Sequence, residues 1–381
     1  VPPRGGWPLI TWAHGTTGVA DRCAPSRGEA LSYLSSSLPS LDHWVAEGYA
    51  IARTDYEGLG TPRVHPYLIG RSEGRGVLDA ARAARRLDPH IGKAFVGGGT
   101  ALFAATIGGL GLTGFIAWVE IQLMPVASAF MDVSTQRFGS LGDFIAVSRE
   151  RDARNEYGVA WVDCMATGQA LGRGVYSSGE HALAGGLSAS ASGTIAVPFN
   201  TRVSMVNGLS TRIFNQAKWL LAPASERKTT EALGRFFHPL DGIHEWNRLY
   251  GRKGFQQFQC VVPDSVAEEG IRTLLEAIAR SGLASFLTVL KRCGDMPSPG
   301  LMSFPMSGMS LAIDFPMSRE LVERLLPRLD DIVRDCKGRL YPAKDAHMRA
   351  DDFRTAYPAW TKVEALRDPV IQSSFWARVT A

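Results

Sequence analysis

The sequence predicts an α+β fold whose main part is an antiparallel sheet, preceded by a segment of a different kind. Strands and helices alternate in the order βαββαβ between residues 255 and 344, a unit that forms an antiparallel sheet with both helices on one face. Residues 1–93 instead carry short apolar runs that lead into glycine-rich turns. With 381 residues, 45% of them hydrophobic, the chain can bury a core and form two or three domains.

The first segment contains two expected strands and one possible nucleophile. The strand at residues 8–13 runs into the turn His14–Gly18, and a second strand is expected at residues 49–52. A glycine-rich turn after a strand can direct backbone N–H groups at a developing oxyanion. The only GxSxG pattern is Gly70–Gly74, and the strand before it is short. Its serine, Ser72, is therefore either a helix N-cap or a nucleophile.

The segment from about residue 8 to residue 93 is similar to the secretory lipases of the α/β-hydrolase family. The similarity is carried by four stretches, His14–Gly18, Thr54–Pro62, His65–Leu68 and Ser72–Arg75. It implies a partial hydrolase-like segment and, as one hypothesis, a serine ester hydrolase. In that family the nucleophile follows the next strand, where this chain has Ala94–Leu102 and no serine.

Composition excludes several classes of partner. A net charge of +4 is too small to indicate a nucleic-acid partner, and the arginines between residues 71 and 86 are spaced as the solvated face of a helix. Residues 94–119 are uncharged, but their glycines favour turns over a transmembrane segment. The five cysteines are widely scattered, so we expect no metal site. The first ten residues do not resemble a signal peptide, and both the cytoplasm and the cell envelope are compatible locations.

Residues 109–114 match the dinucleotide-binding pattern GxGxxG. That pattern places a pyrophosphate only where it opens a helix. Residues 115–124 are rich in β-branched and aromatic side chains and predict a strand instead. The sequence therefore disfavours a nicotinamide-binding site here.

The βαββαβ unit is predicted element by element from periodicity. A capping box at Ser265–Glu268 is expected to open the first helix, and Pro327 to bend the second. The expected elements are a strand at 255–262, a helix carrying Ile271, Leu274, Leu275 and Ile278, strands at 285–291 and 309–315, a helix at 318–336 and a strand at 339–341.

One face of this predicted sheet is polar. Side chains alternate along a strand, so Gln257 and Gln259 share a face, as do Ser310 and Asp314, while Lys291 ends the strand between. The face away from the helices would then present amides, a hydroxyl, a carboxylate and an ammonium group, which suits a hydroxylated ligand. The alternative is an ordinary water-facing sheet.

Residues from about 101 to 381 resemble the vanillyl-alcohol-oxidase type of FAD-dependent flavoproteins. The resemblance is carried by Ala101–Gly114, Ala160–Asp163, Leu171–Arg173, Phe237–Asp241, Glu245–Asn247 and Gly338–Asp345. It implies the end of an FAD-binding domain at 94–130, a substrate domain at 131–339 and a C-terminal segment, 340–381, that returns to the FAD domain. It also implies hydride transfer from a sugar hydroxyl to flavin N5, a small-molecule or lipid-linked sugar as substrate, and a possible partner subunit.

The same resemblance assigns roles to individual residues. Lys344 would lie at the reacting hydroxyl, where an ammonium can stabilise an alkoxide or, if desolvated, act as a base, and Tyr341 would lie beside the flavin. The substrate pocket would be lined by Gln257, Gln259, Lys291, Ser310, Asp314 and Trp161, and the FAD would be contacted by Gly111, Thr113, Gly114 and Ile116. The family has asparagine and cysteine where this chain has Ser310 and Ala312, which leaves the substrate open.

Residues 1–93 do not resemble the lobe with which the family holds the FAD pyrophosphate and adenine. We therefore expect FAD binding to be weak or absent and the chain to be a weakly active or inactive oxidoreductase. The remaining alternatives are the ester hydrolase and a catalytically silent hybrid, or chimera, of the two families.

Overall fold

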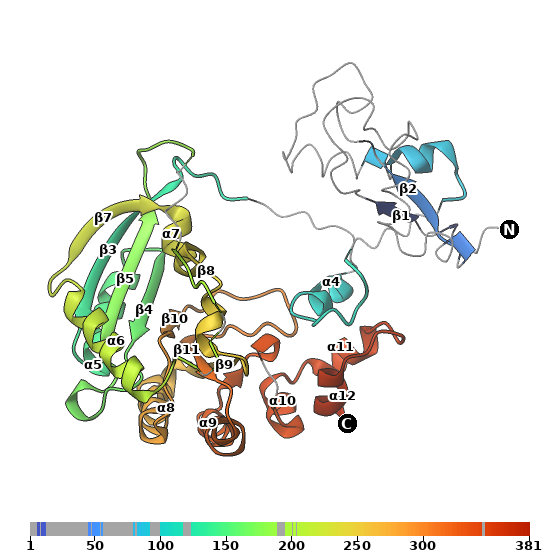
Figure 1. The fold of residues 1–381 in the computed structure, drawn as a ribbon. Helices are drawn as coiled ribbons and strands as arrows, with labels where there is room; N and C mark the ends of the chain where they lie inside the picture. The colour runs from blue at the N-terminus through green and yellow to red at the C-terminus, as the bar shows by residue number, and fades with distance from the viewer. Residues whose placement is uncertain are drawn as a thin grey trace. The chain divides into compact units, whose positions relative to one another are not determined.

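The computed structural model describes residues 6–7, 9–12, 45–46, 48–53, 55, 79–80, 82–91, 100–116, 123–188, 195–199, 201–202, 204–344 and 347–381. The chain divides into two compact units, which are described separately. The first unit comprises Val1–Thr106 and Thr113–Leu123, and the second comprises Ile107–Leu112 and Met124–Ala381. Figure 1 colours both along the chain.

The first unit contains the two strands expected near its start. Strands β1 (Leu9–Trp12) and β2 (Ala50–Arg53) pair in parallel, with Leu9 opposite Ala50. Helix α4 covers Thr100–Thr106. The turn His14–Gly18, Ser72 and the strand interior expected at 117–122 lie outside the described residues. The ends of that expected strand, 115–116 and 123–124, have no regular structure.

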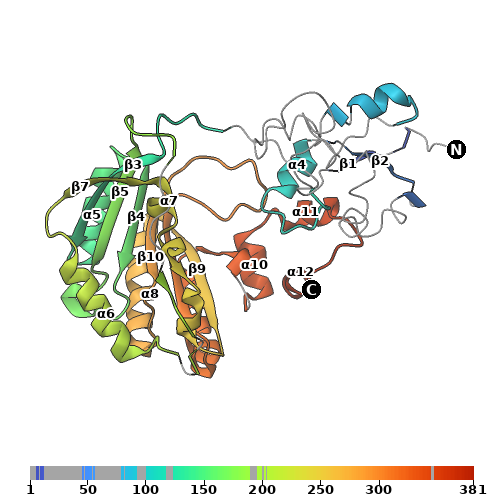
Figure 2. The same ribbon diagram turned by 45° about the horizontal axis from the view of Figure 1, so that its top comes forward.

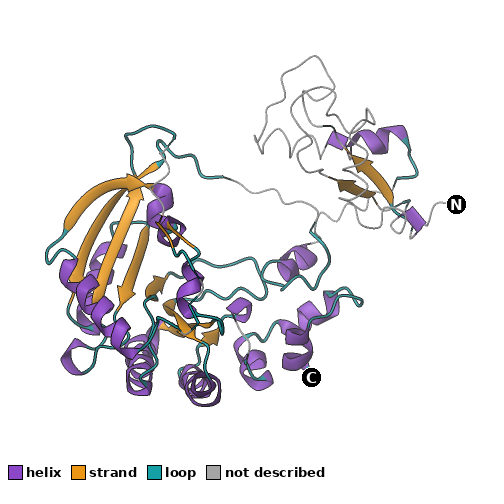
Figure 3. Ribbon diagram, in the orientation of Figure 1, coloured by secondary structure: helices purple, strands orange, loops and turns teal. Residues whose placement is uncertain are grey.

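The second unit is built on an eight-stranded sheet in which every described pairing is antiparallel (Figure 3). Its spatial order is β12-β9-β11-β10-β4-β5-β3-β7. The strands are β3 (Phe130–Phe138), β4 (Tyr157–Val162), β5 (Gly174–His181), β7 (Arg227–Ala232), β9 (Phe255–Pro263), β10 (Thr288–Cys293), β11 (Gly308–Pro316) and β12 (Arg339–Leu340). The mixed helical and antiparallel architecture confirms the α+β class.

The sheet consists of two halves with the same order of elements. The C-terminal half is the predicted unit, β9, α8 (Ala267–Ser281), β10, β11, α9 (Leu326–Asp335) and β12. The N-terminal half repeats this order with β3, α5 (Leu141–Asp152), β4, β5, α6 (Gly208–Leu221) and β7. The halves join where β4 pairs with β10, with Trp161 opposite Val289. Sequence reasoning missed the N-terminal half, because its last strand, RKTTEA, is polar and its helix α6 buries polar side chains.

The core lies on the face that α5, α8 and α9 cover. Phe144 of α5 packs edge-on against Tyr176 of β5, with ring centroids 6.2 Å apart. In the C-terminal half, α8 buries Ile271, Leu274, Leu275 and Ile278, as the helical spacing predicted. On the strands beneath, Cys260, Leu290 and Leu311 are fully buried. Burial of this apolar layer is the main stabilising contribution to the unit.

Two predicted details of the C-terminal half are wrong. Strand β10 begins at Thr288 instead of 285, because the hydroxyl of Ser285 donates to the Leu287 carbonyl in a turn. The capping box does not form: Asp264–Val266 is a 3-10 turn, and α8 starts after Val266 with no side-chain cap. Near Pro327, where a bend is expected, a π-helical turn, Leu321–Leu325, lies directly before α9.

Shorter elements complete the second unit. They are α7 (Leu233–Phe237), the parallel pair β6 (Ile195–Ala196) and β8 (Ile243–His244), and the C-terminal helices α10 (Ala350–Ala356), α11 (Trp360–Leu366) and α12 (Ser374–Thr380). Tyr357, which follows α10, donates a hydrogen bond to the Leu340 carbonyl of β12. Figure 2 shows the sheet and these helices from a second direction. Within the described residues, no helix is both long and apolar enough to span a membrane.

Candidate functional site

The register of the strands in the C-terminal half places the predicted polar side chains on one face of the sheet. Gln257 of β9 lies opposite Asp314 of β11, and Gln259 lies opposite Ala312. Lys291 of β10 lies opposite Ser310. Residues directly opposite in an antiparallel pair point to the same side of the sheet. These side chains therefore share the face away from α8 and α9, which we call the polar wall.

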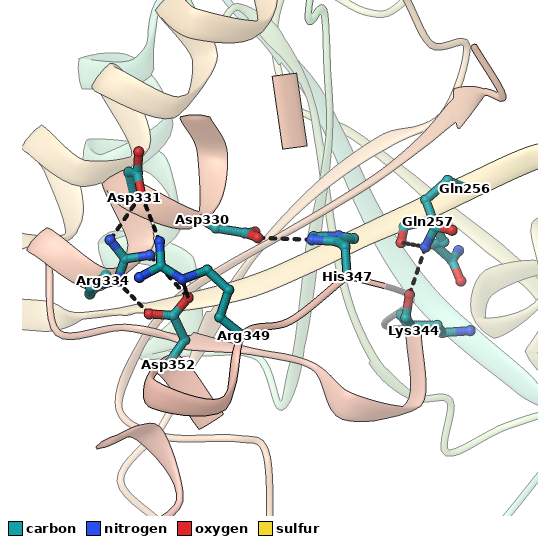
Figure 4. Close-up of polar contacts among 9 residues, drawn as sticks. All are labelled: Gln256, Gln257, Asp330, Asp331, Arg334, Lys344, His347, Arg349 and Asp352. Atoms are coloured by element: carbon teal, nitrogen blue, oxygen red, sulfur yellow. Dashed lines mark hydrogen bonds and ion pairs between the residues drawn. The ribbon is translucent and has the colours of Figure 1, made fainter. Parts of the chain in front are cut away.

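The segment after β12 brings Tyr341 and Lys344 to the edge strand β9. The Tyr341 amide donates to the Gln259 carbonyl at 2.9 Å, and a 3-10 turn, Pro342–Lys344, follows. The Gln256 side chain then donates to the Lys344 carbonyl at 2.9 Å, so β9 holds both ends of this turn (Figure 4). The Tyr341 ring stacks on Phe304 with centroids 4.6 Å apart. Lys344 itself is exposed.

A small pocket lies where β12 ends and β9 continues. It is lined by Gln257, Phe258, Gln259, Leu340, Tyr341, Lys344 and His347. The pocket holds about 10 Å³, roughly the room that one water needs, so within this unit it is a polar notch and not an enclosed sugar site. Four of the predicted site residues, Gln257, Gln259, Tyr341 and Lys344, are thus brought together.

The other predicted substrate residues lie farther along the polar wall. Asp314 is next to Gln257, whereas Ser310 and Lys291 occupy another cross-strand row. Trp161 is in the same row as Gln259 but three strands away, which is about 14 Å at the usual strand spacing. The predicted residues therefore extend along the polar wall. We call the part where Gln257, Gln259, Tyr341 and Lys344 line one pocket its compact end.

Burial dominates the electrostatics of Asp314. Its side chain is almost completely inaccessible, and desolvation raises the pKa of its carboxyl group to about 6, although a hydrogen bond from Gln257 and the charge of Lys344 oppose this rise. One of its carboxylate oxygens, Oδ2, is buried without a hydrogen-bond partner in the described residues. A buried carboxyl with unused hydrogen-bonding capacity beside two amides suits a ligand that carries hydroxyl groups.

Sequence reasoning missed His347 and Asp330, which form a pair at the pocket. His347 Nδ1 lies 2.8 Å from Asp330 Oδ2, and the Asp330 side chain is 4% exposed (Figure 4). Asp330 also borders a larger cleft of about 340 Å³, together with Arg334 and Asp352. A carboxylate at one ring nitrogen fixes the orientation of an imidazole. The two residues come from a helix and a loop with no motif spacing, so no sequence pattern could have found them.

Sequence reasoning also missed Lys218, which lies over Trp161. Its ammonium nitrogen is 4.5 Å from the centre of the Trp161 ring, and burial lowers the pKa of Lys218 to about 8. The Trp161 indole N–H donates to the Phe286 carbonyl at 3.0 Å. Helix α6, which carries Lys218, therefore covers the far end of the polar wall.

The four positions expected to contact FAD are divided between the two units. Gly111 belongs to the second unit, and Thr113, Gly114 and Ile116 belong to the first. Both glycines have positive φ, 75° and 136°, with open space where a Cβ would lie. In the first unit, the Thr113 hydroxyl shares a hydrogen bond with Thr106, and Ile116 is 57% exposed. Their contact with FAD remains a prediction.

The second unit is thus an α+β domain whose antiparallel sheet carries the polar wall. No protein-family model matches the chain. Decaprenylphosphoryl-β-D-ribose oxidase of Mycolicibacterium smegmatis is 33% identical over 281 residues, which cover 70% of this chain and 60% of the oxidase. A protein of Streptomyces coelicolor, described as uncharacterized and in the mprA 5′ region, is 31% identical over 292 residues, covering 72% of this chain and 78% of its own length.

The chain belongs to the family of the Streptomyces coelicolor protein, of whose length it spans 78%. It spans 60% of the length of the oxidase. The similarity to that oxidase supports the resemblance of residues 101–381, and its cofactor and activity are taken up below as proposals for this chain. The lipase-like interpretation of residues 8–93 and the role of Ser72 remain predictions.

Proposed function

We propose that this protein takes part in the FAD-dependent oxidation of a hydroxyl group on a lipid-linked sugar. The observation that supports this proposal most strongly is the compact end of the polar wall, where Gln257, Gln259, Tyr341 and Lys344 surround one pocket. A family relationship to a sugar-lipid oxidase supports the same chemistry.

In this proposal the side chains divide into binding and reacting groups. The amides of Gln257 and Gln259 and the carboxyl group of Asp314 orient the sugar through its hydroxyls, because each can donate or accept at a fixed position on a rigid strand. The ammonium group of Lys344 lies at the reacting carbon and stabilises the negative charge that develops on its oxygen. Tyr341, held by Phe304, provides a flat wall beside the reacting centre.

The proton of the hydroxyl group needs an acceptor, and His347 is the proposed one. Oxidation of an alcohol removes a hydride from carbon and a proton from oxygen, leaving a carbonyl group. His347 lines the pocket together with Lys344, and Asp330 holds its ring. Asp330 borders the 340 Å³ cleft, which gives the proton a route away from the site. The pair therefore acts as a base and a positioning carboxylate.

The cofactor in this proposal is FAD, which supplies the hydride acceptor when bound. Gly111 and Gly114 fit a close approach of the cofactor, since each leaves open space where other residues carry a Cβ. Thr113 and Ile116 are the further proposed contacts. We expect the affinity for FAD to be low, because residues 1–93 do not resemble the pyrophosphate-binding lobe of the family.

The proposed substrate class rests on the related oxidase and on the side chains of the polar wall. The related oxidase is named for decaprenylphosphoryl-β-D-ribose. Ser310 and Ala312 line the wall beside Gln259, where the family carries larger side chains, so a sugar with a different substituent on that side is expected. Lys291 in the next row can pair with a phosphoryl group.

The test uses the full chain with FAD and decaprenylphosphoryl-β-D-ribose. FAD is first titrated while its fluorescence and visible absorption are followed, and the sugar lipid is then added without oxygen. The proposal predicts saturable FAD binding and bleaching of the flavin absorption by the sugar lipid or a close analogue. Protein that cannot bind FAD at any concentration, or bound flavin that no sugar lipid reduces, would contradict it.

A further inference from the structure

Helix α6 has its polar and apolar sides reversed relative to an ordinary surface helix. Its fully buried side chains are Thr211 and Asn215. Its outward side carries Leu209, Ile213 and Leu220, which are 72%, 63% and 54% exposed. Helical periodicity places these three residues on one stripe opposite Thr211 and Asn215. An amphipathic helix of a globular protein normally buries the apolar stripe.

Specific polar contacts fix the helix in this orientation. The Asn215 side chain donates to Asp163 Oδ1 at 2.8 Å, and Asp163 is buried in an ion pair with Arg173. Arg173 also donates to Gln216 at 2.7 Å, and the Trp219 indole donates to the Phe138 carbonyl. Rolling the helix to bury its leucines would break these contacts and deprive the buried Asp163 carboxylate of its hydrogen bond from Asn215, which is costly. The outward apolar stripe is therefore a stable feature.

The exposed apolar surface extends beyond the stripe. Phe214 and Leu221 on the same helix are 43% and 86% exposed, and Met205 just before it is 50% exposed. So many exposed large apolar side chains on and beside one helix are uncommon on a soluble monomer and indicate an apolar partner.

The charges around the patch indicate what that partner is. Between Glu180 and Glu226 the sequence has no acidic residue, while it has three basic ones, Arg202, Arg212 and Lys218. Of these, Arg202 and Arg212 are exposed, whereas Lys218 lies over Trp161 and does not belong to the outward surface. A helix with an apolar stripe and only basic charges is complementary to a membrane surface of anionic lipids.

The position of α6 connects this patch to the candidate site. Lys218 lies over Trp161, and Phe214 packs on Phe286 with ring centroids 4.9 Å apart, so the helix lies on the sheet face that carries the polar wall. A substrate anchored in a bilayer by its prenyl chain would present its sugar to that face. This step rests on the proposed function, whereas the exposure and charge of α6 do not.

We propose that the outward side of α6 docks on an anionic lipid surface and thereby brings the polar wall to a lipid-linked sugar. The occupant is the headgroup and upper acyl region of the bilayer, into which Leu209, Ile213 and Leu220 insert while Arg212 contacts lipid phosphates. A second copy of the chain on the same stripe is the competing outcome.

The test measures sedimentation of the full chain with phosphatidylglycerol–phosphatidylcholine vesicles and with pure phosphatidylcholine vesicles, without FAD or substrate. The chain is expected to bind the anionic vesicles. A variant with Leu209→Ser, Ile213→Ser and Leu220→Ser should lose about a hundredfold in vesicle affinity, and Arg212→Ala roughly fivefold. The matched control replaces Leu87, Met296 and Val370, which are 85%, 89% and 88% exposed elsewhere, by serine and should bind as the parent does.

Three results would overturn the docking proposal, and none of them bears on the proposed oxidation. Equal binding of the triple variant and the parent, or no binding of the parent, would overturn the docking proposal. A triple variant that changes the oligomeric state in gel filtration but not the vesicle affinity would assign the stripe to contacts between copies and would also overturn it. Failure of the proposed oxidation is separate, because flavin bleaching is measured with detergent-dispersed substrate and needs no vesicle.

Discussion

The two halves of the sheet share one order of elements but differ in where their second helix lies. In the C-terminal half, α9 packs beside α8 and buries Leu326, Leu329, Ile332 and Val333 against the core. In the N-terminal half, α6 lies on the opposite face and buries Thr211 and Asn215. The difference indicates that the side chains a helix buries, apolar in α9 and polar in α6, and not its place in the chain, match the face of the sheet that it covers. Lys344, at the other end of the polar wall, is exposed.

The largest effect is expected on the rate at which the sugar lipid reduces the flavin, through Lys344 in the C-terminal half. Replacing Lys344 by methionine keeps the length of the side chain but removes the charge proposed to stabilise the alkoxide. We expect the rate of flavin reduction by the sugar lipid to fall about a thousandfold, with FAD affinity unchanged. The control is Lys228→Met on β7 of the N-terminal half, which is exposed and should react at the parental rate. Equal rates for the two variants would remove Lys344 from the mechanism.

The second prediction compares how a leucine substitution in α8 and one in α6 change the free energy of unfolding. Leu274→Ala in α8 removes a side chain with no exposed surface, and we expect the free energy of unfolding to fall by roughly 3–4 kcal/mol. Leu209→Ala in α6 should change it by less than about 0.5 kcal/mol, because that leucine is 72% exposed. Urea unfolding of both variants measures the difference. Similar losses would mean that the outward stripe of α6 is packed in solution.

The third prediction concerns the pH dependence caused by Asp314. Burial raises the pKa of its carboxyl group from 3.8 to about 6, so the folded state binds a proton more tightly than the unfolded state does. The free energy of unfolding should therefore decrease as the pH rises from about 4 to about 6, by up to about 3 kcal/mol from this group. Asp314→Asn should remove that part of the slope. Urea unfolding at several pH values would show an unchanged slope if the carboxyl group were already ionised in the folded protein.

The smallest expected effect is on the pair at the pocket. Asp330→Asn keeps the shape of the side chain but removes the charge that orients His347, and we expect flavin reduction to slow by roughly tenfold. Rapid mixing of the sugar lipid with the FAD-loaded variant measures this rate. Asp330→Glu, which keeps the charge, should stay closer to the parent, and equal rates for the Asn and Glu variants would indicate only a structural role.

The C-terminal half could be predicted from the sequence because its strands alternate strictly and its helices bury regular apolar stripes. The shared face of Gln257, Gln259 and Asp314 followed from that alternation alone, and the register of β9 with β11 confirms it. The N-terminal half escaped prediction because α6 buries polar residues, contrary to the usual rule. His347 and Asp330 were missed because tertiary packing of a loop on α9, and no local pattern, brings them together.

The most direct test of the central claim is a crystal structure of the full chain with FAD and decaprenylphosphoryl-β-D-ribose or a short-chain analogue. We expect sugar oxygens within hydrogen-bond distance of the Gln257 and Gln259 amides and of Lys344 Nζ. A sugar bound on the N-terminal half, or on the helix-covered face of the sheet, would contradict it.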